Sequence, residues 1–167
     1  IDQNKLKTIF QKLGKNYAKQ TATSIWLHGV SLGEIKILST LAKRLDHGGH
    51  NVLITSTTNT GRAELEKNFS DSNIKFLPFP YDLNFVHKKI INHYKIKKIV
   101  LFESEFWPNL LSLSPKVKII SLNTSISDQS FSRYRSMKFF TSFLFTKIDL
   151  FLAQSKETIN RLNILGA

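Results

Sequence analysis

Short apolar runs alternate with longer amphipathic segments along almost the whole chain. The apolar runs predict six β-strands, at 24–28, 51–56, 74–78, 98–103, 117–122 and 148–153. The amphipathic segments predict helices, at 32–46, 60–69, 83–94, after Pro108, near 130–146 and at 155–165. Strands separated by helices in this way are typical of βαβ units with a parallel sheet. The pattern therefore predicts an α/β fold, a Rossmann-like three-layer α/β/α sandwich with right-handed crossovers.

The domain organisation follows from length and pattern. The chain has 167 residues, which suits one domain with a proper core. Residues 2–13 predict an amphipathic helix, so we divide the chain into an N-terminal lead-in at 1–23 and one domain at 24–167. The absence of cysteine excludes disulfides and thiolate metal sites. The sequence has neither G-x-G-x-x-G after the first strand nor a P-loop, so no NAD or ATP cofactor is predicted.

The net charge of the chain limits the class of binding partner but does not identify one. The 24 Lys and Arg residues outnumber the 12 Asp and Glu residues, which leaves a formal net charge of +12. Such a field attracts the phosphates of nucleic acid, anionic lipid or phosphorylated sugar. A lysine-rich source proteome would account for part of the excess. No stretch approaches the roughly 20 apolar residues that span a bilayer.

Residues 26–34 read Trp-Leu-His-Gly-Val-Ser-Leu-Gly-Glu and carry the first candidate chemistry. A strand ends in Gly29, and a helix begins with Glu34 in its first turn, at the sheet edge where open α/β folds build their sites. Ser31 and Glu34 match the capping box. Alternatively, Glu34 is a general base that the helix dipole keeps ionised, and both roles are compatible. His28 could bind an anion or equally be a satisfied histidine at the strand end.

Residues 102–109 read Phe-Glu-Ser-Glu-Phe-Trp-Pro-Asn and place two acids among large aromatic side chains. Pro108 suits the first turn of a helix, which Glu103 or Glu105 could cap, unless one of them pairs with a lysine. The two acids are two residues apart, so in an extended segment they face the same way. Charge beside apolar bulk is costly unless it is paired. The pattern favours a site at the carboxyl end of the fourth strand.

Two polar segments follow other predicted strands. Residues 55–61 carry hydroxyls and a glycine, which suit either phosphate and sugar oxygens or an ordinary helix cap. Residues 123–135 could bind an anionic headgroup or form a polar loop that enters a helix. The candidate ligand groups in this second segment are Asn123, Ser125, Ser127, Arg133 and Arg135.

Two basic stretches have both ordinary and functional interpretations. Lysines at 88–98 form a run without acids, which is most simply a solvated face. The segment 131–145 is rich in Phe and in basic residues. Some of these rings belong to the core, but such a helix also suits the interface of an anionic bilayer.

Together these motifs resemble the N-terminal half of the 3-deoxy-D-manno-octulosonic acid (Kdo) transferases of lipopolysaccharide synthesis. The matching pieces occur in the family's order and cover nearly all of the chain from Ser24 onward. They are WLHGVSLGE at 26–34, TSTTNTG at 55–61, PFPYD at 78–82, FESEFWPN at 102–109, NTSIS at 123–127 and FLAQSKETINRLNILGA at 151–167.

The resemblance implies the N-terminal half of a GT-B glycosyltransferase that transfers Kdo from CMP-Kdo to the lipid A precursor, lipid IVA. It implies an inverting reaction without a metal or other cofactor, at the cytoplasmic face of the bacterial inner membrane. The acid of the family's H-x-V-S-x-G-E pattern, here Glu34, would be the general base. The residues implied on the acceptor side are Ser31, Gly33, Glu103, Glu105, Asn123, Ser127, Arg133 and Arg135.

The sequence also departs from the family's pattern. The family usually carries an N-terminal membrane anchor and a C-terminal donor domain, neither of which is present in this sequence. Ser125 stands where the family commonly has Arg. We therefore expect the chain by itself to bind acceptor and an anionic membrane surface weakly and to transfer nothing.

Two alternatives remain at this point. The chain could be the N-terminal half of another GT-B sugar transferase, because the donor is recognised in the other half. It could also be a basic, non-enzymatic module that binds nucleic acid or phosphate. Its aromatic residues gather with apolar ones instead of forming a polar stacking platform, and no nucleic-acid motif occurs, so no nucleic-acid partner is predicted.

Overall fold

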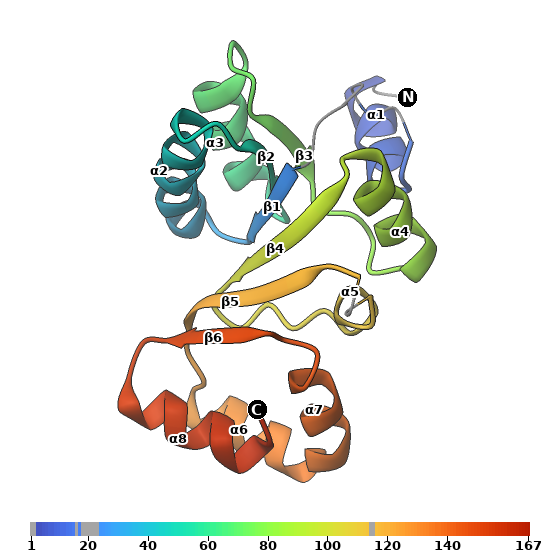
Figure 1. The fold of residues 1–167 in the computed structure, drawn as a ribbon. Helices are drawn as coiled ribbons and strands as arrows, with labels where there is room; N and C mark the ends of the chain where they lie inside the picture. Colours follow the sequence, from blue (N-terminus) through green and yellow to red (C-terminus); the bar gives the residue numbers. More distant parts are fainter. Residues whose placement is uncertain (1–2, 16, 18–23, 114–115) are drawn as a thin grey trace.

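The computed structural model of the chain describes residues 3–15, 17, 24–113 and 116–167. One parallel sheet forms its centre, with the strand order β3-β2-β1-β4-β5-β6 (Figure 1). The sequence order changes direction between β1 and β4, which lie side by side. The strands are β1 (Ser24–Gly29), β2 (Asn51–Ser56), β3 (Lys75–Pro78), β4 (Ile96–Phe102), β5 (Lys118–Thr124) and β6 (Leu150–Ala153).

Helices cover both faces of the sheet and bury two apolar clusters against it. One cluster joins α2 and α3 to the sheet through residues such as Leu27, Ile35 and Leu65, and the other gathers side chains from α4, α5, α7 and α8. The predicted Rossmann-like sandwich is therefore confirmed. The helices are α1 (Gln3–Lys12), α2 (Leu32–His47), α3 (Asn59–Phe69), α4 (Asn84–His93), α5 (Pro108–Leu111), α6 (Asp128–Ser136), α7 (Lys138–Phe145) and α8 (Lys156–Leu165).

The long helix predicted near 130–146 is wrong, because the segment forms two helices. Met137 leaves the helical region, with φ −114° and ψ 35°, and separates α6 from α7. The hydroxyl of Thr141 donates a hydrogen bond to the Tyr134 carbonyl at 3.1 Å across this break. The bend lets α7 bury Leu144 and Phe145, whereas α6 buries no residue. A sequence without Pro or Gly at this point contains no local signal for the break.

The other boundaries differ by a few residues. The predicted strand at 98–103 begins at Ile96 and ends at Phe102. The helix after Pro108 is a single turn. The final helix ends as predicted, because Gly166 adopts φ 90°, the left-handed conformation that stops a helix.

Candidate active site

The candidate site lies where β1 and β4 end, at the change of direction in the sheet. In open α/β sheets, ligands bind in the crevice that such a switch point creates at the carboxyl ends of the strands. Glu34 reaches this edge from the first turn of α2, and Glu103 and Glu105 reach it from the segment between β4 and α5. Two motifs far apart in the sequence therefore meet here.

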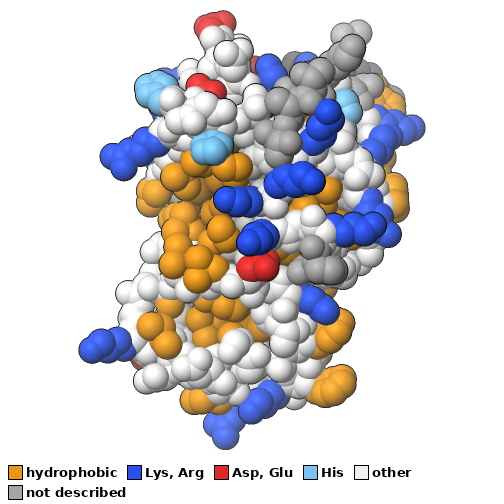
Figure 2. Space-filling model, viewed as in Figure 1, with side chains coloured by type: hydrophobic (Ala, Val, Ile, Leu, Met, Phe, Trp, Pro, Cys, Tyr) orange, Lys and Arg blue, Asp and Glu red, His pale blue; other side chains and the backbone are white. Residues whose placement is uncertain are grey.

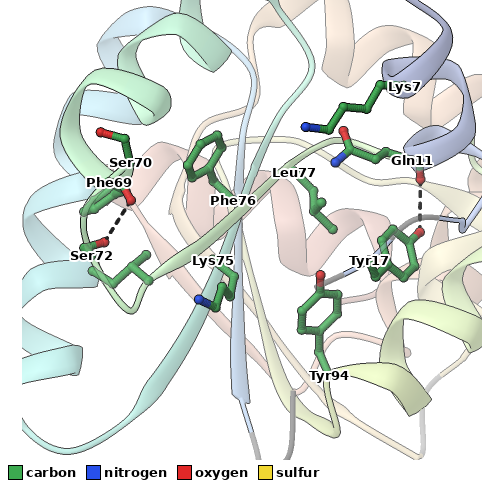
Figure 3. Close-up of a pocket in the computed structure, with 11 residues that line it drawn as sticks. Lys7, Gln11, Tyr17, Phe69, Ser70, Ser72, Lys75, Phe76, Leu77 and Tyr94 are labelled. Atoms are coloured by element: carbon green, nitrogen blue, oxygen red, sulfur yellow. Dashed lines mark hydrogen bonds between the residues drawn. The ribbon is translucent and has the colours of Figure 1, made fainter. Parts of the chain in front are cut away.

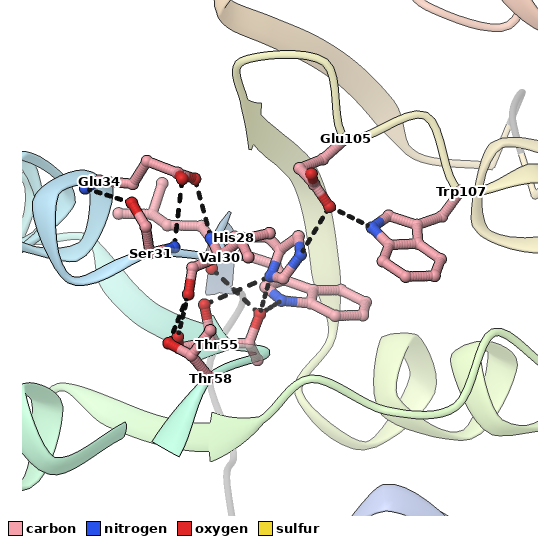
Figure 4. A network of polar contacts seen from close by, with 11 residues as sticks. His28, Val30, Ser31, Glu34, Thr55, Thr58, Glu105 and Trp107 are labelled. Atoms are coloured by element: carbon pink, nitrogen blue, oxygen red, sulfur yellow. Dashed lines mark hydrogen bonds and ion pairs between the residues drawn. The ribbon is translucent and has the colours of Figure 1, made fainter. Parts of the chain in front are cut away.

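Glu34 is held by the predicted capping box, which is confirmed (Figure 4). Its Oε2 accepts the backbone N–H of Val30 at 2.8 Å, and its Oε1 accepts that of Ser31 at 3.1 Å. The hydroxyl of Ser31 in turn accepts the Glu34 N–H at 3.3 Å. A carboxylate has about four lone-pair positions, so these two bonds leave acceptor capacity for a ligand.

Gly29 makes room for this arrangement at the end of β1. A Cβ at this position would lie 2.9 Å from Cδ1 of Leu38 and 3.2 Å from Cβ of Glu34. The first distance is shorter than real Cβ contacts, and the second is tighter than most of them. The glycine before the turn therefore lets α2 approach the strand end closely and sets the position of Glu34.

The polar segment 55–61 supports the same turn from the neighbouring strand. The hydroxyls of Ser56 and Thr58 both donate to the Val30 carbonyl, at 3.0 and 2.7 Å. Thr58 is also the N-cap of α3 and accepts the Gly61 N–H at 3.1 Å. Of the two interpretations of this segment, the structure favours the helix cap.

Glu103 occupies a strained backbone position immediately after β4. Its φ is +60°, and its N–H donates to the Leu122 carbonyl at 2.8 Å, while the hydroxyl of Ser121 donates to its carbonyl at 3.0 Å. Asn123, on β5, also has φ +60°. Non-glycine residues in this conformation cluster at functional sites, because they cost of order 1–3 kcal/mol.

The prediction that Glu103 and Glu105 face the same way assumed an extended backbone between them. That assumption is wrong, because Glu103 has φ +60°. The chain turns at Glu103 instead, but the turn still brings its carboxyl near the other two acids. Burial raises the pKa of Glu103, and the charges of Glu34 and Glu105 raise it further. Three carboxyl groups therefore share this edge of the sheet.

Glu105 is oriented by the indole of Trp107 and lies beside the ring of His28. The Trp107 indole N–H donates to Oε2 of Glu105 at 2.8 Å, and Nε2 of His28 lies 3.7 Å from the same oxygen. His28 is fully buried, which does not suit an anion ligand, but it is not a fully satisfied histidine either, because its Nε2 has no hydrogen-bond partner. Figure 4 shows Glu34 and Glu105 on either side of this ring.

The suggestion that Glu103 or Glu105 caps α5 is wrong, because Asp82 does so. Its two carboxylate oxygens accept the backbone N–H groups of Asn109, at 3.1 Å, and Leu110, at 3.0 Å. Nε2 of His87 lies 2.8 Å from Oδ1 of the same carboxylate. Burial by itself would raise the pKa of Asp82, but the contacts with His87 and the backbone N–H groups keep it below its ordinary value. Among the described residues, neither Glu103 nor Glu105 pairs with a lysine.

The remaining predicted site residues lie in α2 and α6 or at the N-caps of these helices. Ser31 and Gly33 are exposed on the first turn of α2. Ser127 is the N-cap of α6, and both predicted arginines are exposed near the end of that helix. Arg133 and Glu105 act in opposite directions on the pKa of Tyr134, which burial raises, so both charges lie close to this ring.

Sequence reasoning missed the groups that hold Glu105 and His28, namely Thr55 and the indole N–H of Trp107. Their only signal was an aromatic residue two positions after an acid and a threonine at a strand end, and both occur widely in cores. Among the residues that the structure describes, no three acids and histidines lie close enough together to hold a metal ion.

An apolar cavity of about 200 Å³ opens beside Glu105, between the β4–α5 segment and α6–α7. Phe106, Tyr134, Met137 and Phe140 contribute to its wall. The neighbouring Phe139 is 93% exposed and Phe143 is 53% exposed. Large apolar side chains exposed together mark a surface that contacts a partner or a membrane. We call the exposed side chains of Met137, Phe139, Phe140 and Phe143 the α6–α7 apolar patch.

Positive charge is spread over the molecular surface. Figure 2 shows many Lys and Arg side chains and few acids on one face. Near the α6–α7 apolar patch, Nζ of Lys147 lies 4.6 Å from the centre of the Phe143 ring. Within the described part of the chain, no helix has the length and apolarity needed to cross a bilayer.

A larger cavity, of about 530 Å³, lies away from the acids (Figure 3). It is bounded by α1, by the connection from α3 to β3 and by Tyr17 and Tyr94. Tyr94 immediately precedes β4, so this cavity lies toward the amino ends of the strands. None of its described lining residues is an acid. Ligands of open α/β sheets bind at the opposite edge, at the carboxyl ends of the strands.

Several known proteins are similar to this chain in sequence. A family model described as 3-deoxy-D-manno-octulosonic-acid transferase (kdotransferase) matches residues 7–167. A bifunctional glycosyltransferase/methyltransferase of Fusobacterium nucleatum is 34% identical over 99% of this chain and 27% of its own length. The 3-deoxy-D-manno-octulosonic acid transferase of Haemophilus influenzae is 28% identical over 85% of the chain and 34% of its own length.

A third relative, the 3-deoxy-D-manno-octulosonic acid transferase of Bordetella pertussis, is 34% identical over 62% of the chain and 25% of its own length. The matched region thus makes up between a quarter and about a third of these relatives.

Proposed function

Since the chain belongs to the 3-deoxy-D-manno-octulosonic-acid (Kdo) transferase family, we propose that it forms the acceptor-binding part of a glycosyltransferase. In this proposal the complete protein transfers Kdo from CMP-Kdo to the lipid A precursor, lipid IVA. The observation that carries the proposal is the gathering of Glu34, Glu103 and Glu105 at the switch point of the sheet.

Glu34 is the proposed general base. Its carboxylate accepts two backbone N–H groups at the start of α2, which hold it in place and leave lone pairs free to accept a proton. In the proposed step, an acceptor hydroxyl forms a bond to the anomeric carbon of Kdo while the bond from that carbon to the CMP phosphate breaks. The hydroxyl proton passes to a free lone pair of Glu34, and CMP leaves with the bonding electrons.

The other two acids are proposed to orient the acceptor. Burial and the two neighbouring acids raise the pKa of Glu103, and its carboxyl group is proposed to hydrogen-bond with a sugar hydroxyl. Glu105 faces the same edge and is oriented by Trp107. Ser31, Gly33, Asn123 and Ser127 line the approach in this proposal, where exposed N–H and hydroxyl groups can meet sugar hydroxyls.

The surface beside the acids suits the lipid part of such an acceptor. Arg133 and Arg135 are exposed at the end of α6 and can meet the lipid's phosphates. The 200 Å³ cavity and the α6–α7 apolar patch can accommodate acyl chains or the surface of an anionic bilayer. This arrangement supports a location at the cytoplasmic face of the inner membrane, with the acceptor drawn from the bilayer.

The test of this function is substitution of Glu34 in the complete protein that carries this chain. We expect Glu34→Gln and Glu34→Ala both to lower kcat for Kdo transfer by about 10²–10⁴-fold, the usual contribution of a general base. Glutamine retains an oxygen for the capping box, so Glu34→Gln should change stability less than Glu34→Ala.

The matched control is Glu157→Gln, which removes an acid from the first turn of α8 and should leave transfer close to normal. Normal turnover in Glu34→Gln would mean that Glu34 is only a helix cap. Failure of the unsubstituted complete protein to transfer Kdo to lipid IVA would exclude the proposed donor and acceptor.

A further inference from the structure

The His28 ring is fully buried directly behind the candidate site. It stacks on Phe79, with ring centres 3.8 Å apart and an angle of 22° between the planes. Its Nδ1 lies 3.0 Å from the hydroxyl oxygen of Thr55, whereas its Nε2 has no hydrogen-bond partner. Buried polar atoms without partners are uncommon, and each calls for a physical explanation.

The hydrogen bonds around Thr55 indicate which nitrogen of His28 carries the proton. The Trp26 indole N–H can only donate, and it donates to the Thr55 hydroxyl oxygen at 2.9 Å. The single hydroxyl proton of Thr55 can then bond Nδ1 of His28 at 3.0 Å or the Leu27 carbonyl at 3.4 Å, and the shorter contact is favoured. In that case Nδ1 is the acceptor, and neutral His28 carries its proton on Nε2.

The opposite tautomer has a poorer environment. It would donate from Nδ1 to the Thr55 hydroxyl oxygen at 3.0 Å or to the Thr55 carbonyl at 3.3 Å, with the Thr55 hydroxyl donating to the Leu27 carbonyl at 3.4 Å. It would also turn the lone pair of Nε2 toward the Glu105 carboxylate. Two acceptors would then face each other across 3.7 Å inside the protein. Burial lowers the pKa of His28, although Glu105 opposes this shift, so the ring is neutral and the choice between tautomers matters.

We propose that His28 is a positioning residue, whose Nε2–H is aimed at Glu105 by a buried chain from Trp26 through Thr55. The effect of His28 on catalysis rests on the proposed function. The position of its proton on Nε2 and the orientation of that N–H toward Glu105 do not. Because His28 is inaccessible to solvent, it acts on a ligand only through Glu105. Together with Trp107, it gives Oε2 of Glu105 two ring N–H groups and restricts rotation of the carboxylate.

The 3.7 Å separation is too long for a hydrogen bond, and closing it requires Glu105 to move inward by roughly 0.5–1 Å. Catalytic hydrogen bonds are often long without substrate and shorten in the complex. A bound sugar that presses on the outer side of Glu105 would satisfy the buried N–H at the same time. In this way His28 favours the position of Glu105 that a correctly seated acceptor requires.

The first test uses the 167-residue chain and reads the tautomer directly. With ¹⁵N-labelled histidine, long-range ¹H–¹⁵N correlation at pH 7 should show a protonated Nε2 and an unprotonated Nδ1 for His28. Glu105→Gln should shift the Nε2–H resonance, and Thr55→Val should remove the preference for this tautomer. A proton on Nδ1 of His28 would overturn the proposal. An Nε2–H chemical shift that is unchanged by Glu105→Gln would also overturn it.

The second test measures Kdo transfer by the complete protein in a double-mutant cycle. His28→Asn loses the Nε2 position and should lower kcat/KM about tenfold. His28→Gln places an amide N–H near that position and should lower it less. In the Glu105→Gln background, His28→Asn should have little further effect, because its partner is already altered.

Equal effects of His28→Asn in both backgrounds would show that His28 does not act through Glu105. If the unsubstituted complete protein transfers no Kdo, the proposed function fails. The resonance measurements then decide by themselves whether His28 directs its N–H at Glu105.

Discussion

Gly29 lies so close to Glu34 that a side chain on the first would press against the second. A Cβ on Gly29 would lie 3.4 Å from Oε2 of Glu34 and 3.2 Å from its Cβ. It would also lie 2.9 Å from Leu38. The turn after β1 therefore depends on the absence of a single methyl group.

The first prediction concerns this contact. Gly29→Ala should lower the free energy of unfolding by about 1–3 kcal/mol, the usual cost of adding volume to a packed site. It should also lower Kdo transfer by the complete protein, because α2 must move away and carry Glu34 with it. Urea unfolding and initial rates measure the two effects. Unchanged stability and activity would show that the turn accommodates the methyl group, contrary to this account.

The second prediction concerns Asp82, which joins the 78–82 motif to the start of α5. Asp82→Asn should lower the free energy of unfolding by about 2–3 kcal/mol at neutral pH, because a buried charged acceptor of several hydrogen bonds is lost. Urea unfolding at pH 7 measures the loss. The exposed Asp71 provides the control, since Asp71→Asn removes a carboxylate whose one hydrogen bond, to Ser70, is long.

The same residue should contribute to acid sensitivity. Because the pKa of folded Asp82 lies below its ordinary value of 3.8, its stabilisation is present above that value and is lost as the pH falls below it. The stability difference between the natural chain and Asp82→Asn should therefore shrink at low pH. A difference that stays constant down to the acid transition would contradict the proposed role.

The third prediction is a second pH effect, from His28. Burial lowers its pKa below 6.5, so in the range below 6.5 the unfolded chain binds a proton that the folded chain does not. Stability should therefore rise with pH up to about 6.5. His28→Gln should flatten this slope, whereas His50→Gln, at an exposed position, should retain it. Unfolding midpoints between pH 5 and 7 provide the measurement.

The fourth prediction concerns membrane binding by the α6–α7 apolar patch. Phe139→Ser combined with Phe143→Ser should weaken sedimentation with anionic phospholipid vesicles about tenfold or more, because two exposed rings can no longer enter the interface. Phe85→Ser is the matched control, since Phe85 is 62% exposed on α4, away from the patch. Equal losses for the control would mean that binding does not depend on this surface.

Salt dependence separates the two contributions to this binding. Added salt should weaken vesicle binding of the unsubstituted chain, because the basic residues beside the patch interact with anionic headgroups through screened charges. Neutral vesicles should bind less at every salt concentration. A single-stranded oligonucleotide that competes effectively at moderate salt would favour the nucleic-acid alternative.

The sequence by itself determined the layers of the fold and the sheet edge at which the candidate acids gather. The periods of apolar residues are local signals, so strands and helices could be assigned from them, and parallel strands bring their carboxyl ends to one edge. The capping box at Ser31 and Glu34 was also predictable, because it depends on two residues three positions apart. The last helix stopped at Gly166 for an equally local reason.

Only the tertiary structure decided the contacts between segments far apart in the chain. It showed that Asp82 caps α5, that Thr55 faces His28, and that His28 faces Glu105. The helix break at Met137 also depends on tertiary structure, because it lets α7 bury Leu144 and Phe145. Such contacts depend on how the elements pack, and the packing is set by the sum of many small interactions that no local pattern records.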